Sequence, residues 1–269
     1  MRPARGETLV VAVSGGADSA ALGALLGRAA ARAGASLVFA HVNHALRASA
    51  WQDEAVVLAL GAACGVRVVA VSLAPGPAGE ARLRAGRYAA LAQIARSVGA
   101  SRICTAHHAA DQTETVLLAL FRGAGPAGLR GMPEHRELEP GLELWRPLLD
   151  VEPAALRAYC AARHIPVAID PTNVGMEYRR NAVRAAVATL RGEFPHLDAA
   201  VARCARILRE EQVEAPTAIL RERLRSELVT FHGDARDVTF ERLDAAARAL
   251  ERGRRGRHFL RRGLEVVVE

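Results

Sequence analysis

Strand-like and helix-like segments alternate through the first half of the chain. The expected strands are residues 9–13, 37–42, 66–73 and 101–107, and the expected helices are about 18–33, 51–64, 80–98 and 111–122. Parallel strands need long crossover connections, so this alternation predicts an α/β fold, with a parallel sheet covered by helices on both faces in a Rossmann-like arrangement. In such sheets, ligands bind outside the carboxyl ends of the strands.

The second half of the chain has a different character. Residues 151–190 predict a helix, a short extended piece at 165–169, a turn at Asp170-Pro171 and a further helix. From about residue 197 the sequence is mostly helix-like and rich in arginine, and "GLEVVVE" at its end predicts one strand. We therefore expect two domains, residues 1–195 with the α/β fold and residues 196–269 as a small, basic, mostly helical region.

Arginine supplies all the positive charge of the chain, which contains no lysine and has a net charge of +7. Many of these arginines gather near residues 179–191 and 248–262, and such clusters suit a polyanionic partner. No apolar run approaches the ~20 residues that cross a bilayer, and the N-terminus lacks a signal-peptide pattern. The four separated cysteines are typical of buried residues in a reducing cytosol. These features predict a cytoplasmic protein without a membrane partner.

The stretch "LVVAVSGGADSAAL" joins the first expected strand to the first expected helix. The residues that we expect to face a phosphate are Ser14, Gly15, Gly16, Ala17, Asp18 and Ser19. Adjacent glycines expose backbone N–H groups, and the N-terminus of a helix favours an anion. Asp18 would repel a phosphate directly, so it is a candidate ligand for Mg²⁺ shared with the phosphate oxygens. The alternative is a capped strand–turn–helix joint without a ligand.

This loop resembles the pyrophosphatase loop of the N-type ATP pyrophosphatases, whose fold is of the adenine nucleotide alpha hydrolase type. Over about residues 8–190 the chain is similar to the tRNA(Ile)-lysidine synthase family. The further motifs are "HVNHALR" (41–47), "AHHAADQTETVLLALFRGAGPAGLRGM" (106–132), "WRPLL" (145–149) and "IDPTNVGMEYRRNAVRAAV" (169–187). The resemblance implies a PP-loop ligase in tRNA processing that uses ATP, Mg²⁺ and free L-lysine. Cytidine O2 of a CAU anticodon would attack the α-phosphate of ATP, and the lysine ε-amine would then displace AMP at C2.

The resemblance also implies roles for particular residues. Asp111 and Glu114 lie three positions apart at a helix start and share a face, so we expect them to hold the lysine ammonium. Simple compensation of the helix dipole is the alternative for such a pair. The family usually has two adjacent acids where this chain has Ala110-Asp111, and the retained Asp111 keeps the spacing to Glu114. Asn43 is the expected nucleotide contact, and Arg122 would neutralise the departing pyrophosphate or the RNA backbone.

Two arginine-containing segments are the expected contacts for tRNA(Ile). The residues concerned are Tyr178, Arg180, Asn181, Arg184, Arg254, Arg255 and Arg257. The arginines would bind phosphates, and Tyr178 offers a surface on which a base could stack. A capped helix start with a solvated basic face is the alternative for the first segment. A homodimer is compatible with the sequence, which does not determine the oligomeric state.

Three other functions use some of the same features. A PP-loop tRNA thiolase would need a reactive cysteine or a cluster of them, an amide-forming ligase of small acids would not need the basic C-terminal third, and a non-catalytic tRNA-binding protein would not need Asp18, Asp111 and Glu114 together. Longer members of the family carry additional C-terminal domains that help to select the tRNA. The arginine-rich tail here looks like at most a remnant of one, so tRNA selection would rest on the catalytic domain and the tail.

Overall fold

The computed structural model describes residues 3–43, 50–73, 80–168, 178–210, 216–232, 238–261 and 263–268. The chain divides into two compact units. The first consists of Met1–Thr115 with Met132–Ala202, and the second of Val116–Gly131 with Arg203–Glu269. The expected division near residue 195 remains a prediction.

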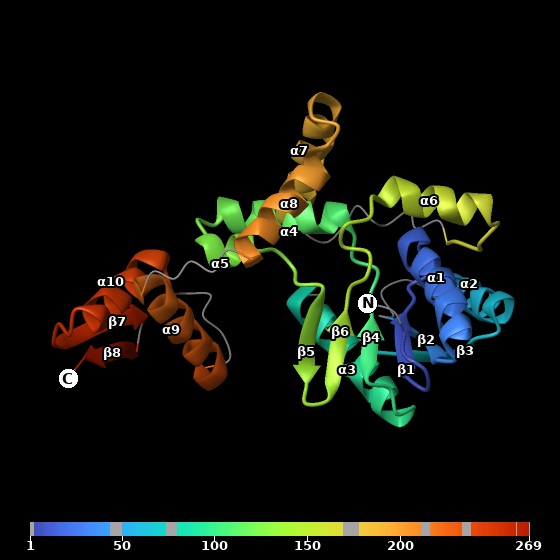
Figure 1. The fold of residues 1–269 in the computed structure, drawn as a ribbon, viewed down its shortest axis with the longest axis horizontal. Coiled ribbons are helices and arrows are strands. Elements are labelled where there is room, and N and C mark those ends of the chain that lie inside the picture. Colours follow the sequence, from blue (N-terminus) through green and yellow to red (C-terminus); the bar gives the residue numbers. More distant parts are fainter. Residues whose placement is uncertain are drawn as a thin grey trace. The chain divides into compact units, whose positions relative to one another are not determined.

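The first unit is built on a six-stranded sheet (Figure 1). Its strands are β1 (Thr8–Ala12), β2 (Ser36–Asn43), β3 (Arg67–Ser72), β4 (Arg102–Cys104), β5 (His135–Glu139) and β6 (Leu142–Trp145). They lie in the order β3-β2-β1-β4-β6-β5, and all neighbours are parallel except β5 and β6. The chain turns from one half of the sheet to the other between β1 and β4, and this position is the usual ligand site of doubly wound sheets.

Helices cover both faces of the sheet, as the sequence predicts. On β1, Leu9 and Val11 face one core while Val10 faces the other, because successive side chains of a strand point in opposite directions. The first core includes residues of α1 (Ala17–Ala33), α2 (Ala50–Cys64) and α6 (Pro153–Ala162), and the second includes residues of α3 (Glu80–Ser97). The predicted α/β fold is confirmed.

The part of the chain between β4 and the C-terminal helices contributes three more long helices. They are α4 (Ala109–Phe121), α7 (Tyr178–Glu193) and α8 (Leu197–Glu210). The expected turn at Asp170-Pro171 lies outside the described residues. Within the described ranges, no helix is both long and apolar enough to cross a membrane.

The second unit contains the short helix α5 (Pro126–Leu129), α9 (Pro216–His232), α10 (Phe240–Glu251) and the antiparallel hairpin β7 (Gly256–Arg261) with β8 (Leu264–Val268). Its small core joins Leu228 of α9, Leu243 and Ala246 of α10 and Leu260 of β7. The expected single strand at the end of the chain is confirmed as β8, whereas its partner β7 was not predicted. The hairpin β5–β6 was not predicted either.

Candidate active site

The loop after β1 has a backbone that requires glycine at one position. Gly15 has φ = +97°, a value in the region that L side chains rarely adopt. A Cβ atom there would also lie 3.4 Å from both Ala168 Cβ and the Asp53 carbonyl oxygen. The Ala168 N–H donates to the Gly15 carbonyl at 2.9 Å. The loop is therefore held in one shape by the chain that surrounds it.

The two serines of the loop bond mainly to the loop itself. The Ser19 hydroxyl donates to the Gly16 carbonyl at 2.9 Å and accepts from the Ser14 N–H at 3.1 Å. The two hydroxyl oxygens are also 3.1 Å apart. Gly16 is the N-cap of α1 and no side chain caps the helix. The N-terminus of α1 thus keeps backbone N–H groups that no side chain caps, and the binding of an anion there stays a prediction.

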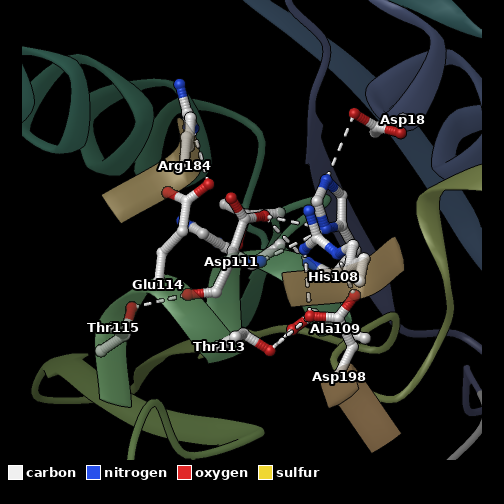
Figure 2. A network of polar contacts seen from close by, with 12 residues as sticks. Asp18, His108, Ala109, Asp111, Thr113, Glu114, Thr115, Arg184 and Asp198 are labelled. Carbon is white, nitrogen blue, oxygen red and sulfur yellow. Dashed lines mark hydrogen bonds and ion pairs between the residues drawn. The ribbon is translucent and has the colours of Figure 1, made fainter. Parts of the chain in front are cut away.

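Asp18 lies in the first turn of α1 and has two differently placed carboxylate oxygens. Oδ1 is buried and has no hydrogen-bond partner among the described residues. Oδ2 lies 3.5 Å from Nε2 of His108 (Figure 2). A buried carboxylate oxygen without a partner is costly unless a cation or donor satisfies it. Its environment therefore fits a bound cation, although the described residues contain no group of three His, Cys, Asp or Glu that would hold a metal alone.

His108 reaches Asp18 because β4 and β6 continue their alignment beyond the ends of the strands. An isolated parallel bridge pairs His108 with Leu148 of the "WRPLL" motif. The Ala109 N–H then donates to the Val151 carbonyl at 3.0 Å. Leu148 of the motif and the nearby Val151 therefore fix the start of α4 at the same edge of the sheet as the loop after β1.

His108 also contacts Asp111, the first of the two predicted lysine carboxylates. Asp111 Oδ2 accepts from the His108 N–H at 3.0 Å and lies 3.5 Å from His108 Nδ1. Burial alone would lower the pKa of His108, but the contact with Asp18 and the charges of Asp111 and Asp18 outweigh it, so the pKa is raised above its usual value. The imidazole therefore links the phosphate loop to α4 (Figure 2).

Glu114, the second predicted lysine carboxylate, is buried and already contacts a cation. Its Oε1 accepts from Nε of Arg184 at 2.6 Å, and the side chains of Glu114 and Arg184 are 7% and 47% exposed. Arg184 belongs to α7 and was predicted as an RNA contact. The structure thus brings one predicted lysine ligand and one predicted tRNA contact together in a single ion pair.

A second arginine of α7 forms a comparable pair. Arg191 donates to Asp198 from Nε at 2.8 Å and from Nη2 at 3.0 Å. The Thr113 hydroxyl of α4 donates to the same carboxylate at 2.5 Å. Burial would raise the pKa of Asp198, but these hydrogen bonds and the Arg191 charge hold it below its usual value. This network attaches α7 and the start of α8 to α4.

The end of β2 carries the expected nucleotide contact. Asn43 is half-buried at the end of that strand, and its carbonyl accepts from the Leu73 N–H at 2.8 Å. His41, on the same strand, is buried, and its Nδ1 lies 2.9 Å from the Val13 carbonyl oxygen. His41 therefore packs beneath the phosphate loop, while His44 lies outside the described residues.

The remaining predicted residues belong to α7 or to the second unit. Asn181 of α7 is half-buried, whereas the side chains of Tyr178 and Arg180 lie outside what the structure describes. Arg122 is exposed and belongs to the second unit. Three further predicted residues, Arg254, Arg255 and Arg257, are exposed in the second unit. Their roles remain predictions.

The cysteines do not form a reactive group. Burial raises the pKa values of Cys64, Cys104 and Cys160, so these thiols are poor nucleophiles. Cys104 and Cys160 are buried as expected, whereas Cys64 is only partly buried and Cys204 is exposed; all four are free thiols.

Sequence reasoning missed three residues of the network. No role was predicted for His108, although its position at a strand end, three residues before Asp111, is a signal that could have identified it. Asp198 and Arg191 form a pair seven residues apart. The hydrogen bond that Asp198 accepts from Thr113 joins positions 85 residues apart and has no local signal.

The chain matches a known domain family and is similar to several curated proteins. A model of the PP-loop domain matches residues 1–190. The tRNA(Ile)-lysidine synthase of Ralstonia nicotianae is 44% identical over 209 residues, which cover 76% of this chain and 45% of that protein. The tRNA(Ile)-lysidine synthase of Gloeobacter violaceus is 40% identical over 208 residues, which cover 77% and 64%. The chain thus spans about half to two thirds of the length of these curated relatives.

A solved structure shares the fold at low sequence identity. The U34-tRNA thiolase NcsA of Methanococcus maripaludis superposes with a TM-score of 0.67 at 14% identity, covering 78% of this chain and 75% of that chain. This likeness concerns the fold alone.

Proposed function

Because the chain belongs to the family of PP-loop domains, we propose that it catalyses the ATP-dependent ligation of lysine to C2 of the wobble cytidine in the CAU anticodon of tRNA(Ile). The observation that carries the proposal is the meeting of three acids at one sheet edge. His108 lies between Asp18 of the phosphate loop and Asp111 of α4, and Glu114 follows one turn later. The names of the curated relatives support the same reaction.

The loop after β1 would bind the β- and γ-phosphates of ATP. The N-terminus of α1 has no side-chain cap, and Gly15 permits the close approach of the backbone. Asp18 would hold Mg²⁺ through its unpartnered Oδ1, and the ion would supply charge neutralisation for the pyrophosphate that leaves. His41, under the loop, would keep the Val13 carbonyl and therefore the loop in place.

The reaction then has two steps. In the first, cytidine O2 bonds to the α-phosphorus of ATP and the bond to the β-phosphate oxygen breaks, which releases pyrophosphate. In the second, the ε-amine of lysine bonds to C2 of the activated cytidine, the C2–O bond breaks and AMP leaves. Free lysine carries an ammonium with a pKa of ~10.4, so a proton must be removed before the attack.

Asp111 and Glu114 are the proposed holders of that ammonium. Both lie in the first two turns of α4, and the Arg184 guanidinium on Glu114 supports the view that this carboxylate is placed to receive a cation. Carboxylates can then accept the proton that the amine loses. His108 would keep Asp111 in position through the contact with its Oδ2.

The tRNA would be attracted by arginine. Arg254, Arg255 and Arg257 are exposed and could bind phosphates, and Arg257 also lies 3.2 Å from Glu265. A single-stranded anticodon loop lets the cytidine leave its stack at low cost. Thiolation of tRNA is not favoured, because burial raises the pKa values of three of the four cysteines.

The direct test is incorporation of labelled lysine. The protein is incubated with ATP, radiolabelled lysine and either tRNA(Ile) with a CAU anticodon or initiator tRNA(Met), which shares that anticodon. We expect label in tRNA(Ile) only, with stoichiometric AMP and pyrophosphate. Absence of label in both tRNAs would overturn the proposed reaction, and label in both would overturn the proposed selectivity.

A further inference from the structure

Arginine side chains surround one tyrosine of α3. The guanidinium carbons of Arg84, Arg87 and Arg136 lie 5.6, 5.7 and 5.9 Å from the centroid of the Tyr88 ring. Arg146, the residue after β6, lies next to the same tyrosine and is only 2% exposed. The Tyr88 cluster is the set formed by Arg84, Arg136, Arg146 and Tyr88.

The Tyr88 cluster holds positive charge that no described carboxylate neutralises. Among the described residues, Arg84, Arg136 and Arg146 form no ion pair. Nη1 of Arg146 donates at 2.7 Å to the Pro133 carbonyl, which is an uncharged acceptor. Burial lowers the pKa of Arg146, the charges of Arg136 and Arg84 lower it further, and the neighbouring Tyr88 opposes the shift. An anion placed among these groups would relieve their mutual repulsion.

Two buried polar groups of the cluster have no hydrogen-bond partner in the described part of the chain. They are the hydroxyl of Tyr88 and Nε of Arg146. Buried polar groups are almost always hydrogen-bonded, so two exceptions in neighbouring side chains indicate a ligand. Arg136 is exposed and Arg84 is half-buried, so an anion can enter from solvent when the Arg136 side chain rotates. Guanidinium groups and a hydroxyl together match the oxygens of a phosphate.

The Tyr88 cluster lies at the edge of the sheet that also carries the phosphate loop. Leu144 belongs to the second core and Trp145 to the first, so alternation along β6 directs Arg146 to the face that α3 covers. Arg136 pairs with Leu144 in the β5–β6 hairpin and therefore shares that face. Arg146 follows β6 directly, and the carboxyl ends of β6, β4 and β1 lie at one edge because these strands are parallel neighbours.

We propose that the Tyr88 cluster is a phosphate-binding site that takes a backbone phosphate of the tRNA next to the anticodon. The inference rests on the proposed function. The cytidine must reach the phosphate loop at this edge of the sheet, so the nucleotides that flank it pass along the same edge. A phosphate bound there would neutralise the arginines and accept a hydrogen bond from the tyrosine hydroxyl. The contact would position the RNA backbone without reading a base.

Tyr88→Phe separates a binding role from a packing role, because it removes only the hydroxyl. That hydroxyl has no partner among the described residues, so its removal should leave the midpoint of urea unfolding of the RNA-free protein unchanged or raise it. The tRNA affinity should fall on the order of 10-fold, because a charge-assisted hydrogen bond to the phosphate is lost. An unchanged tRNA affinity would overturn the proposal, whatever happens to the midpoint.

Arg136→Gln tests the charge of the cluster, and Arg163→Gln is its matched control. Arg163 is also exposed, and its guanidinium carbon lies 5.6 Å from the Tyr159 ring of α6. Arg136→Gln should weaken tRNA binding and make the log–log salt dependence shallower by roughly 0.7 to 0.9, the value for one phosphate contact. Arg163→Gln should keep the wild-type affinity and slope. Equal changes in both variants would reveal only general attraction of RNA to positive charge and would overturn the site.

Inorganic phosphate distinguishes an RNA phosphate from a free anion as the ligand. Urea unfolding of wild type and Arg136→Gln is measured with increasing phosphate at constant ionic strength. If phosphate stabilises only wild type, and both Tyr88→Phe and Arg136→Gln keep the wild-type tRNA affinity, the site binds a free anion and the RNA contact is overturned. Failure of lysine incorporation by wild type with ATP and tRNA(Ile) would overturn the proposed function, whereas the losses of tRNA affinity in the two variants would still identify the phosphate site.

Discussion

The strand-end cluster of the first unit and the arginine-rich hairpin of the second unit carry charge in opposite ways. In the cluster, Asp18, His108 and Asp111 are linked at fixed distances and are partly shielded from solvent. In and just before the hairpin, Arg254 and Arg255 are exposed, and Arg257, with a side chain 76% exposed, lies 3.2 Å from Glu265.

The difference indicates that the two regions have different roles. Charges held at fixed positions and shielded from water interact strongly with a reacting group, so they suit chemistry. Exposed charges are screened by salt and act mainly on the affinity for a polyanion. Substitutions in the cluster should therefore affect particular reaction steps, whereas substitutions in the hairpin should affect the binding of all tRNAs alike.

The largest effect is expected for Asp18→Asn. The change removes the charge beside the phosphate loop while it keeps the size of the side chain. Adenylation of tRNA should fall on the order of 1,000-fold. Without the Asp18 carboxylate, the proposed Mg²⁺ would no longer be held, and the charge of the departing pyrophosphate would not be neutralised. The tRNA affinity should stay close to wild type. Pyrophosphate release and a tRNA-binding titration measure the two quantities, and full turnover by the variant would remove the metal-binding role.

The next largest effect is expected for Asp111→Asn and Glu114→Gln. Each variant loses a charge-assisted contact with the lysine ammonium, which is worth about 1.5–3 kcal/mol, or roughly 10- to 150-fold. The KM for lysine should rise and kcat should fall, while the KM for ATP should change little. Steady-state kinetics with each substrate varied in turn would show the separation. A rise in the KM for ATP alone would place these acids in the nucleotide site.

A smaller effect, on stability, is expected for Asp198→Asn. The variant weakens the hydrogen bonds to Arg191 and Thr113, so we expect a loss of about 2 kcal/mol in the free energy of unfolding at neutral pH. Because the pKa of Asp198 is lowered in the folded protein, its contribution is present above the ordinary aspartate pKa of about 3.9 and is lost as the pH falls through the lower folded value.

Urea unfolding of wild type and Asp198→Asn at several pH values tests the direction of this pH dependence. The difference between the two should be constant from pH 7 to about 5 and should shrink below about pH 4. If the difference in the free energy of unfolding grew as the pH fell, the conclusion that the deprotonated Asp198 carboxylate stabilises the fold would be contradicted.

The smallest effect for each residue is expected in the hairpin region. Replacement of Arg254, Arg255 and Arg257 by Ala should weaken the binding of cognate and non-cognate tRNAs equally. The log–log dependence of affinity on salt should become shallower by roughly 0.7 to 0.9 for each lost phosphate contact. Fluorescence titration over a range of salt concentrations would measure the slope. If it does not change, these arginines form only a solvated face.

The sequence predicted the first unit well where local pattern determines structure. The apolar runs of β1, β2 and β3 and the helices between them were identified within a few residues. The hairpin β5–β6 was missed because "HRELE" is largely polar, and its place at the edge of the sheet allows such residues. β7 was missed because "GRHFLR" is rich in arginine, although Leu260 packs into the core beneath it.

The site was predictable only as far as its residues lie in motifs. The location of the acids in the loop and in α4 could be predicted, because these acids come after strand ends that meet at one edge of the sheet. The pairing of Glu114 with Arg184 joins residues 70 positions apart, and the contact of His108 with Asp18 joins the residue before α4 to the first turn of α1. Such contacts depend on tertiary packing, which a single sequence does not encode in any local spacing.

The most direct test of the proposed division between loop and helix is a single turnover of Glu114→Gln in the absence of lysine. If the loop performs adenylation and α4 handles lysine, the burst of pyrophosphate from ATP and tRNA(Ile) should persist at close to the wild-type amplitude, while lysidine formation on later addition of lysine should be strongly reduced. Loss of the burst together with lysidine formation would show that Glu114 belongs to the ATP site, and would contradict the account.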